Sequence, residues 1–80
     1  MTKGDVFNRV QDVFIDVFDR EDLIINELMN SDEIQEWDSL NHLVLINSIE
    51  NEFDIKFSFE EVASFNNVGG LIERIMQIIK

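Results

Sequence analysis

The chain has 80 residues, of which 17 are acidic and 6 are basic, so its formal net charge is −11. This length builds one domain with one modest core, and this charge repels nucleic-acid phosphates and anionic lipid while favouring basic protein surfaces. The chain contains no cysteine and a single histidine, which excludes disulfides and thiolate chemistry and leads us to expect no metal site.

The sequence also lacks the signals of membrane proteins and secreted proteins. No apolar run is long enough to span a bilayer, and the first residues lead directly into an amphipathic pattern without a secretory signal. We therefore expect a cytoplasmic monomer with no membrane span and no nucleic-acid partner.

The first segment is predicted to be an amphipathic helix over about residues 5–18. Its apolar residues recur at three- and four-residue steps, as one face of a helix requires. They are Val6, Phe7, Val10, Val13, Phe14, Val17 and Phe18. Between about Glu21 and Glu36 the period fades, and the apolar residues there either form a short helical turn or pin a long loop to the core. Loops of this length are often functional.

A second helix is predicted over about 38–52, with Asp38 or Ser39 at its start. Leu43, Ile46, Ile49 and Phe53 are expected to share its buried face, with Leu45 beside them.

Two further helices complete the chain. Ser58 and Glu61 match a capping box, which predicts a short third helix over 59–65. The last helix is predicted over 67–79, with a buried stripe of Val68, Leu71, Ile72, Ile75, Met76 and Ile79. Because no segment alternates like a strand, we predict one all-α domain over residues 1–80.

Ser39 is the residue most easily assigned a chemical role, because it sits where the long loop meets the second helix. His42 follows three positions later, within reach on a helix, which raises the possibility of a Ser–His nucleophile. No pocket or oxyanion-hole loop accompanies the pair, so we interpret His42 as a surface residue that hydrogen-bonds locally, and we assign no catalytic residue. Asp38 can cap the helix, present a carboxylate to a basic partner, or do both.

The order of these features resembles the acyl carrier protein family. The resemblance rests on the acidic loop, Asp38-Ser39-Leu40, the amphipathic helix ending in Glu50-Asn51-Glu52-Phe53-Asp54-Ile55, and Asn67-Val68 opening the last helix. It implies a four-helix bundle with a long loop between its first two helices and a short third helix. It also implies that Ser39 receives 4′-phosphopantetheine from coenzyme A through a separate, magnesium-dependent phosphopantetheinyl transferase. The arm's thiol would carry an acyl group as a thioester, so the chain would be a carrier and not an enzyme.

The second helix is the main recognition surface of that family. Leu40 and Val44 fall on one side of it and are predicted to anchor partner enzymes, unless they fill the rim of the core. Asp38, Asn41, Asn47 and Glu50 flank them as further partner-recognition residues. The implied partners are the transferase, an acyl- or aminoacyl-loading enzyme, and a downstream acyltransferase or synthase, each with a basic surface. Asn41, Val44 and Asn51 are neutral where fatty-acid carriers usually place more acid, which departs from that subgroup.

Trp37 stands where fatty-acid carriers usually have a small residue, and here the chain is more similar to D-alanyl carriers and specialised stand-alone carriers. The alternative is that Trp37 packs the end of the loop onto the bundle.

Our hypothesis is a carrier of acyl groups between separate enzymes of fatty-acid, polyketide or other specialised biosynthesis. A D-alanyl or other aminoacyl carrier is one alternative, and an unmodified acidic helical adaptor that binds through Leu40 and Val44 is another. Large side chains such as Phe14 and Phe18 predict a filled interior, so a short or polar cargo outside the bundle is as plausible as a long chain.

Overall fold

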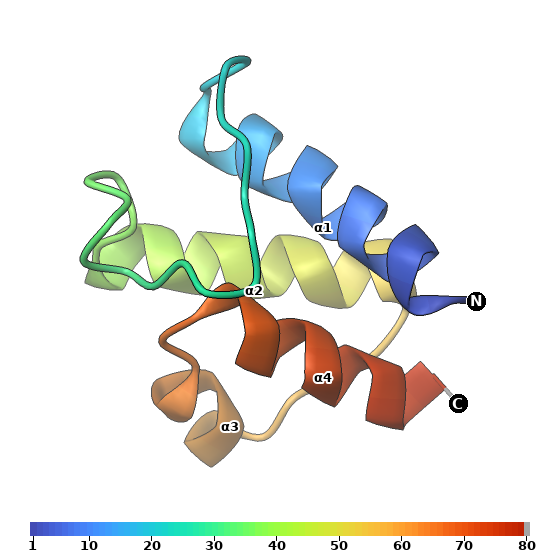
Figure 1. Ribbon diagram of the computed structural model, residues 1–80. Coiled ribbons are helices and arrows are strands. Elements are labelled where there is room, and N and C mark those ends of the chain that lie inside the picture. The colour runs from blue at the N-terminus through green and yellow to red at the C-terminus, as the bar shows by residue number, and fades with distance from the viewer. Residues whose placement is uncertain (80) are drawn as a thin grey trace.

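A computed structural model describes residues 1–79 and contains four helices, α1 (Lys3–Phe18), α2 (Ser39–Phe53), α3 (Phe59–Ser64) and α4 (Val68–Ile79). Within that part of the chain no strand is formed, and the β-type pairing is confined to one isolated bridge between Asn30 and Asn67. In Figure 1, α2 crosses the molecule between α1 above it and α4 below it, and the short α3 lies at the lower edge. The predicted all-α, four-helix architecture is confirmed.

Two of the helices begin with reciprocal capping boxes. The Thr2 hydroxyl accepts a hydrogen bond from the Asp5 backbone N–H, and the Asp5 carboxylate accepts one from the Thr2 N–H, both at 3.1 Å. This cap explains why α1 begins at Lys3, two residues before the predicted start. Ser58 and Glu61 make the same arrangement at α3, at 3.1 and 3.3 Å, as their spacing predicts.

Both long helices end on an aspartate in the left-handed conformation. Asp19 has a φ of 53° and Asp54 a φ of 54°. The backbone N–H of Asp19 donates to the Ile15 carbonyl, and that of Asp54 to the Glu50 carbonyl. Aspartate tolerates this conformation better than most residues, although glycine is the commoner choice.

The core is built from α1, α2, α4 and the long loop. Its buried residues are Val6, Val10, Val13, Phe14, Phe18, Leu23, Ile25, Ile34, Trp37, Leu45, Ile46, Ile49, Val68, Leu71, Ile72 and Ile75. Thus α3 contributes no fully buried side chain. Helix α3 therefore lies at the surface of the molecule, where it can border a site.

One predicted core position on α2 is wrong. Leu43 is 58% exposed, whereas Leu45 is completely buried. Each residue advances about 100° around a helix, so a buried face centred on Ile49 includes Leu45 and Ile46 and leaves Leu43 beyond its edge. Leu43 is therefore a surface residue close to Ser39.

The loop between α1 and α2 is pinned to the core and forms no helix. Leu23, Ile25, Ile34 and Trp37 supply its buried side chains. The Gln11 side chain on α1 fixes its first half, because its amide nitrogen donates to the Leu23 carbonyl at 2.6 Å and its oxygen accepts from the Ile25 N–H at 2.8 Å. Of the two structures left open for this segment, the pinned loop is the one adopted.

The loop also supports the start of α4. The Val68 N–H donates to the Met29 carbonyl at 2.9 Å, and the Gly69 N–H donates to the Glu27 carbonyl at 3.0 Å. A Cβ added at Gly69 would lie 2.8 Å from the Glu27 carbonyl oxygen, closer than van der Waals contact permits. The close approach of the two backbones thus requires glycine at this position.

Candidate functional site

Ser39 is the first residue of α2, and its side chain is exposed. Asp38 caps the helix in front of it, since its carboxylate accepts a hydrogen bond from the Asn41 backbone N–H at 2.9 Å. The Asn41 amide nitrogen in turn donates to the Glu36 carbonyl at 2.8 Å and fixes the end of the loop. Ser39 is therefore presented from a junction held by two side-chain hydrogen bonds.

The Ser39 hydroxyl has no hydrogen-bonding partner among the residues that the structure describes. It lies at the positive end of the α2 dipole, which stabilises an anionic group placed there. A phosphodiester on this oxygen would meet a favourable field, and the residues around the serine fit such a group. The hydroxyl is accessible but has no base beside it, which suits a point of attachment.

His42 is not paired with Ser39, because other groups engage both of its ring nitrogens. Trp37 Nε1 donates to His42 Nδ1 at 2.8 Å, and His42 Nε2 lies 2.8 Å from the Val62 carbonyl oxygen on α3. The interpretation of His42 as a surface residue with local hydrogen bonds is correct only for the bond from Trp37, because His42 is half-buried and its other partner, Val62, lies twenty residues further on. Its register could have indicated this, since His42 precedes Leu45, Ile46 and Ile49 by three, four and seven residues.

A groove of about 610 Å³ opens beside Ser39, between the start of α2 and α3, contrary to the expectation that no pocket accompanies Ser39 and His42. Leu43 on α2 faces Phe59 and Ala63 on α3 across it, and Trp37 and His42 also line it. Phe59 is 87% exposed, and no motif in the sequence assigns it to the site. An extended arm attached to Ser39 would find a largely apolar surface within reach.

The predicted recognition residues on α2 fall into two groups. Leu40 and Val44 are 72% and 45% exposed, so they do not fill the rim of the core, and Asn47 is exposed near them. Asn41 is engaged with the loop, and the Glu50 carboxylate accepts the Phe57 backbone N–H at 2.8 Å. The structure therefore gives Asn41 and Glu50 structural roles and leaves Leu40, Val44 and Asn47 free.

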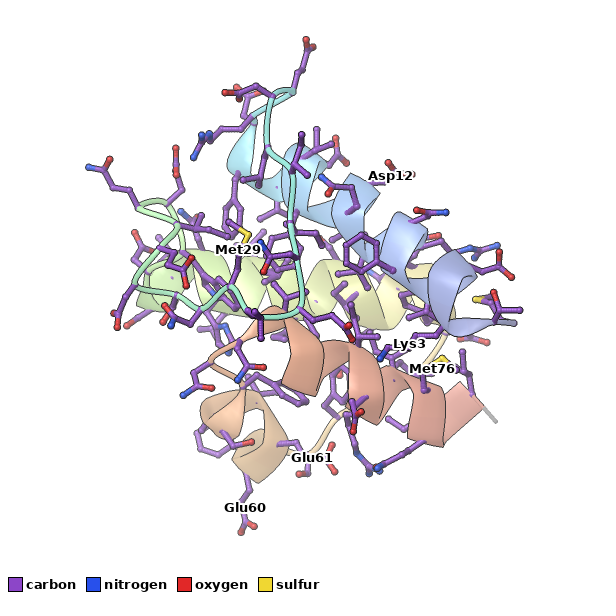
Figure 2. All side chains as sticks on the ribbon, in the orientation of Figure 1. Lys3, Asp12, Met29, Glu60, Glu61 and Met76 are labelled. Atoms are coloured by element: carbon purple, nitrogen blue, oxygen red, sulfur yellow. The ribbon has the colours of Figure 1, made fainter. Side chains whose placement is uncertain are left out.

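Most of the basic side chains are neutralised within the molecule. The shortest ion pairs join Lys3 to Glu27 and Arg74 to Glu61, both at 2.7 Å. The hydrogen bond from Arg74, more than any other contact, lowers the pKa of Glu61, and the Glu27 side chain raises the pKa of Lys3. Figure 2 shows Glu60 pointing away from the bundle, next to Glu61 on the same helix. The surface therefore offers mainly acidic groups to a partner.

Within residues 1–79, we found neither a metal-binding cluster nor a membrane-spanning helix. No three histidine or acidic side chains in this range converge closely enough to hold a metal ion. In the same range, no helix has both the length and the apolar character needed to cross a membrane.

Comparison with known proteins gives two findings. Residues 8–75 match the family model described as a phosphopantetheine attachment site. The fold is also similar to the solution structure of a holo acyl carrier protein from Geobacter metallireducens, with a TM-score of 0.83 and 30% sequence identity over 90% of this chain and 83% of that one. Proteins of this kind interact with a phosphopantetheinyl transferase, hold 4′-phosphopantetheine covalently and carry substrates for biosynthetic enzymes without being catalysts themselves. The match over most of its length shows that this chain belongs to the acyl carrier protein family of phosphopantetheine attachment domains.

Proposed function

We propose that Ser39 is the attachment residue and that the chain carries an acyl group between separate enzymes of fatty-acid, polyketide or other specialised biosynthesis. The observation that carries this proposal is the exposed Ser39 hydroxyl at the N-terminus of α2, without a hydrogen-bonding partner among residues 1–79 and next to an apolar groove. In the loading step, Ser39 Oγ attacks the pyrophosphate phosphorus of coenzyme A that bears the pantetheine arm. The P–O bond between the two pyrophosphate phosphorus atoms breaks, adenosine bisphosphate leaves, and the serine proton passes to the transferase. The bound group supplies the thiol that a cysteine-free chain lacks, and this thiol holds the cargo as a thioester.

Leu40 and Val44 support docking of partner enzymes on α2. Both are apolar, exposed and within the first two turns after Ser39. Together with Asp38 beside the serine and Asn47 on the same helix, Leu40 and Val44 form a surface that suits a basic enzyme surface with an apolar pocket. Asn41 and Glu50 contribute to this surface through the loop and the α2–α3 connection that they hold in place.

Intact mass tests the attachment residue. The purified chain is incubated with coenzyme A, magnesium and a broad-specificity phosphopantetheinyl transferase, beside Ser39→Ala and Ser31→Ala. Ser31 is the matched control because it lines the same groove. We expect one phosphopantetheine mass on the wild type and on Ser31→Ala, and none on Ser39→Ala. A folded, initially unmodified wild type that gains no mass would favour the acidic adaptor.

Ser39→Ala also tests whether Ser39 serves only as an attachment residue or contributes to the stability of the fold. Asp38, not Ser39, caps the helix, so we expect the free energy of unfolding to change by less than about 1 kcal/mol. Urea unfolding of both proteins measures this difference. A larger loss would give Ser39 a structural role and weaken the use of this variant as a clean functional control.

The cargo is tested on the loaded chain. We expect a mass gain with octanoate and an acyl-adenylating enzyme. A gain only with D-alanine and an aminoacyl-adenylating enzyme would assign the chain to aminoacyl transfer instead. Leu40→Asp should slow either loading reaction, and Asn8→Asp, which adds the same charge at an exposed position on α1, should not.

A further inference from the structure

The two hydrogen bonds of His42 define one protonation state of its ring. The Val62 carbonyl oxygen can only accept a hydrogen bond, so His42 Nε2 must carry the proton and donate it. The Trp37 indole N–H can only donate, so His42 Nδ1 must be unprotonated. The neutral Nε2–H tautomer satisfies both partners at once, whereas a proton on Nδ1 would oppose the indole N–H.

These bonds join elements that differ greatly in how firmly they are held. Trp37 is 4% exposed and packs edge-on against Phe14 with 5.3 Å between the ring centroids. Val62 belongs to α3, which has no fully buried side chain. Thus His42 connects α3, a helix of six residues without a fully buried side chain, to the buried end of the loop at Trp37.

The same two side chains separate the groove from the core. Trp37 and His42 both line the groove beside Ser39. Their ring planes are inclined by only 21°, with centroids 6.1 Å apart, and Phe14 lies against Trp37 on the core side. The hydrogen-bonded pair is therefore part of a floor that continues to α3 through the Val62 carbonyl.

We propose that His42 is a positioning residue that holds α3 against α2 and closes the floor of the groove, so that an acyl cargo stays between Leu43 and Phe59 and does not enter the core. The cargo part rests on the proposed function. The link itself belongs to the unmodified chain and needs no arm on Ser39. It also explains why a polar ring occupies a position on α2 in register with Ile46 and Ile49.

The link can be tested first on the unmodified chain by nuclear magnetic resonance. The chain has one tryptophan and one histidine, so the indole N–H and the imidazole nitrogens each give a single set of signals. We expect the Nε2–H tautomer at neutral pH. In His42→Phe, which keeps a ring but removes both bonds, the indole signal should move toward that of a solvent-exposed tryptophan. Amide exchange in α3 should become about ten-fold faster, as expected for the loss of one net hydrogen bond, while α4 stays unchanged.

Two variants control this experiment. His42→Gln retains a donor and an acceptor, so it should slow α3 exchange relative to His42→Phe, which a purely space-filling role would not do. Asn47→Ala, on an exposed position of α2, should leave the indole signal and α3 exchange as they are. An Nδ1–H tautomer in the wild type, or an indole signal and α3 exchange unaffected by His42→Phe, would overturn the proposal.

The cargo part is tested on octanoyl-loaded chains. In the wild type, we expect loading to shift signals of Leu43, Phe59 and Ala63 and to leave Phe14 unchanged. In loaded His42→Ala, Phe14 should shift as well, because the floor is open. Equal shifts of the Phe14 signals in both proteins would overturn the proposal that His42 closes the floor of the groove. A chain that accepts no arm on Ser39 would instead refute the proposed function, and the measurements on the unmodified chain would then decide for or against the His42 link.

Discussion

The loop at residues 19–38 and helix α3 border the same groove but are held in opposite ways. The loop has no helix, yet it buries four apolar side chains and is clamped by Gln11. Helix α3 has regular backbone bonds and a capping box, yet none of its side chains is fully buried. Regular secondary structure is therefore a poor guide to which part of this molecule is firmly attached, because burial of apolar area contributes more than local hydrogen bonds do.

Helix α3 is attached by polar contacts at its surface and by the half-buried Val62, which packs against the core. His42 binds its Val62 carbonyl, and Arg74 on α4 makes two hydrogen bonds to Glu61, at 2.7 and 3.1 Å. Phe65, directly after the helix, adds an edge-on contact to Phe57 with 5.0 Å between centroids. Since such contacts can break one at a time, we expect α3 to be the wall of the groove that opens most readily.

The largest expected effect comes from removing an anchor of the loop. Ile34 is 1% exposed, so Ile34→Ala should lower the free energy of unfolding by about 3 kcal/mol. The matched change in α3, Val62→Ala, should cost no more than about 1 kcal/mol because that side chain is only half-buried. Urea unfolding compares the two, and Ile34→Val gives a milder step if the alanine variant does not fold. Equal losses at Ile34 and Val62 would remove the contrast between loop and helix.

The second effect concerns the contact between the loop and α4. In Gly69→Ala, the new Cβ would lie 2.8 Å from the Glu27 carbonyl oxygen, so one of the two backbones must shift. We expect a loss of about 2 kcal/mol, although alanine is the better helix former. At Gly4 the nearest neighbouring atom is 3.8 Å away, so Gly4→Ala should be neutral or stabilising by up to about 1 kcal/mol. Thermal unfolding of both variants measures the difference, and a stabilised Gly69→Ala would mean that the loop does not press on α4 as closely as described.

The sequence predicted the features that depend on neighbouring residues. The capping box of Ser58 and Glu61 and the helix starting after Asp38 are encoded within four residues, and both are found. The buried face of α2 was assigned less well because apolar residues surround much of that helix, so the period alone could not place Leu43 outside and Leu45 inside.

Features that join distant segments could not be predicted in the same way. Val62 lies twenty positions after His42, and no local pattern connects the two residues. Gln11 likewise clamps carbonyl and amide groups of a loop twelve and fourteen residues further on. The position of Ser39 at the start of α2 followed from local signals, whereas the groove beside it depends on where α3 packs. Modification of Ser39 stays a prediction until its mass is measured.

A smaller effect tests the polar attachment of α3 through pH. The pKa of Glu61 is lowered in the folded chain by the hydrogen bond from Arg74 and, less strongly, by the Ser58 backbone. A lowered folded-state pKa adds stability above the unfolded pKa of about 4.3, and that contribution is lost as the pH falls through the folded value. Glu61→Gln, which keeps the capping box, should therefore lower Tm at neutral pH, by an amount that shrinks in acid.

Glu60→Gln is the control for this charge effect, because Glu60 points away from the bundle and has no ion-pair partner within residues 1–79. Its Tm difference from the wild type should show no comparable loss at neutral pH. If Glu60→Gln and Glu61→Gln behave alike from neutral to acid pH, the Arg74 contact does not hold α3.

The smallest expected effect tests whether a substitution that stabilises α2 also slows amide exchange in α3. Asp54 ends α2 with a φ of 54°, where glycine is relaxed, so Asp54→Gly should raise the free energy of unfolding by up to about 1 kcal/mol. Amide exchange in the last turn of α2 should slow by the corresponding factor. Exchange in α3 should not slow, because that helix opens by releasing its own contacts to His42 and Arg74 without unfolding α2. Equal slowing in both helices would show that α2 and α3 open as one unit. Helix α3 would then not be held more loosely than the loop at residues 19–38.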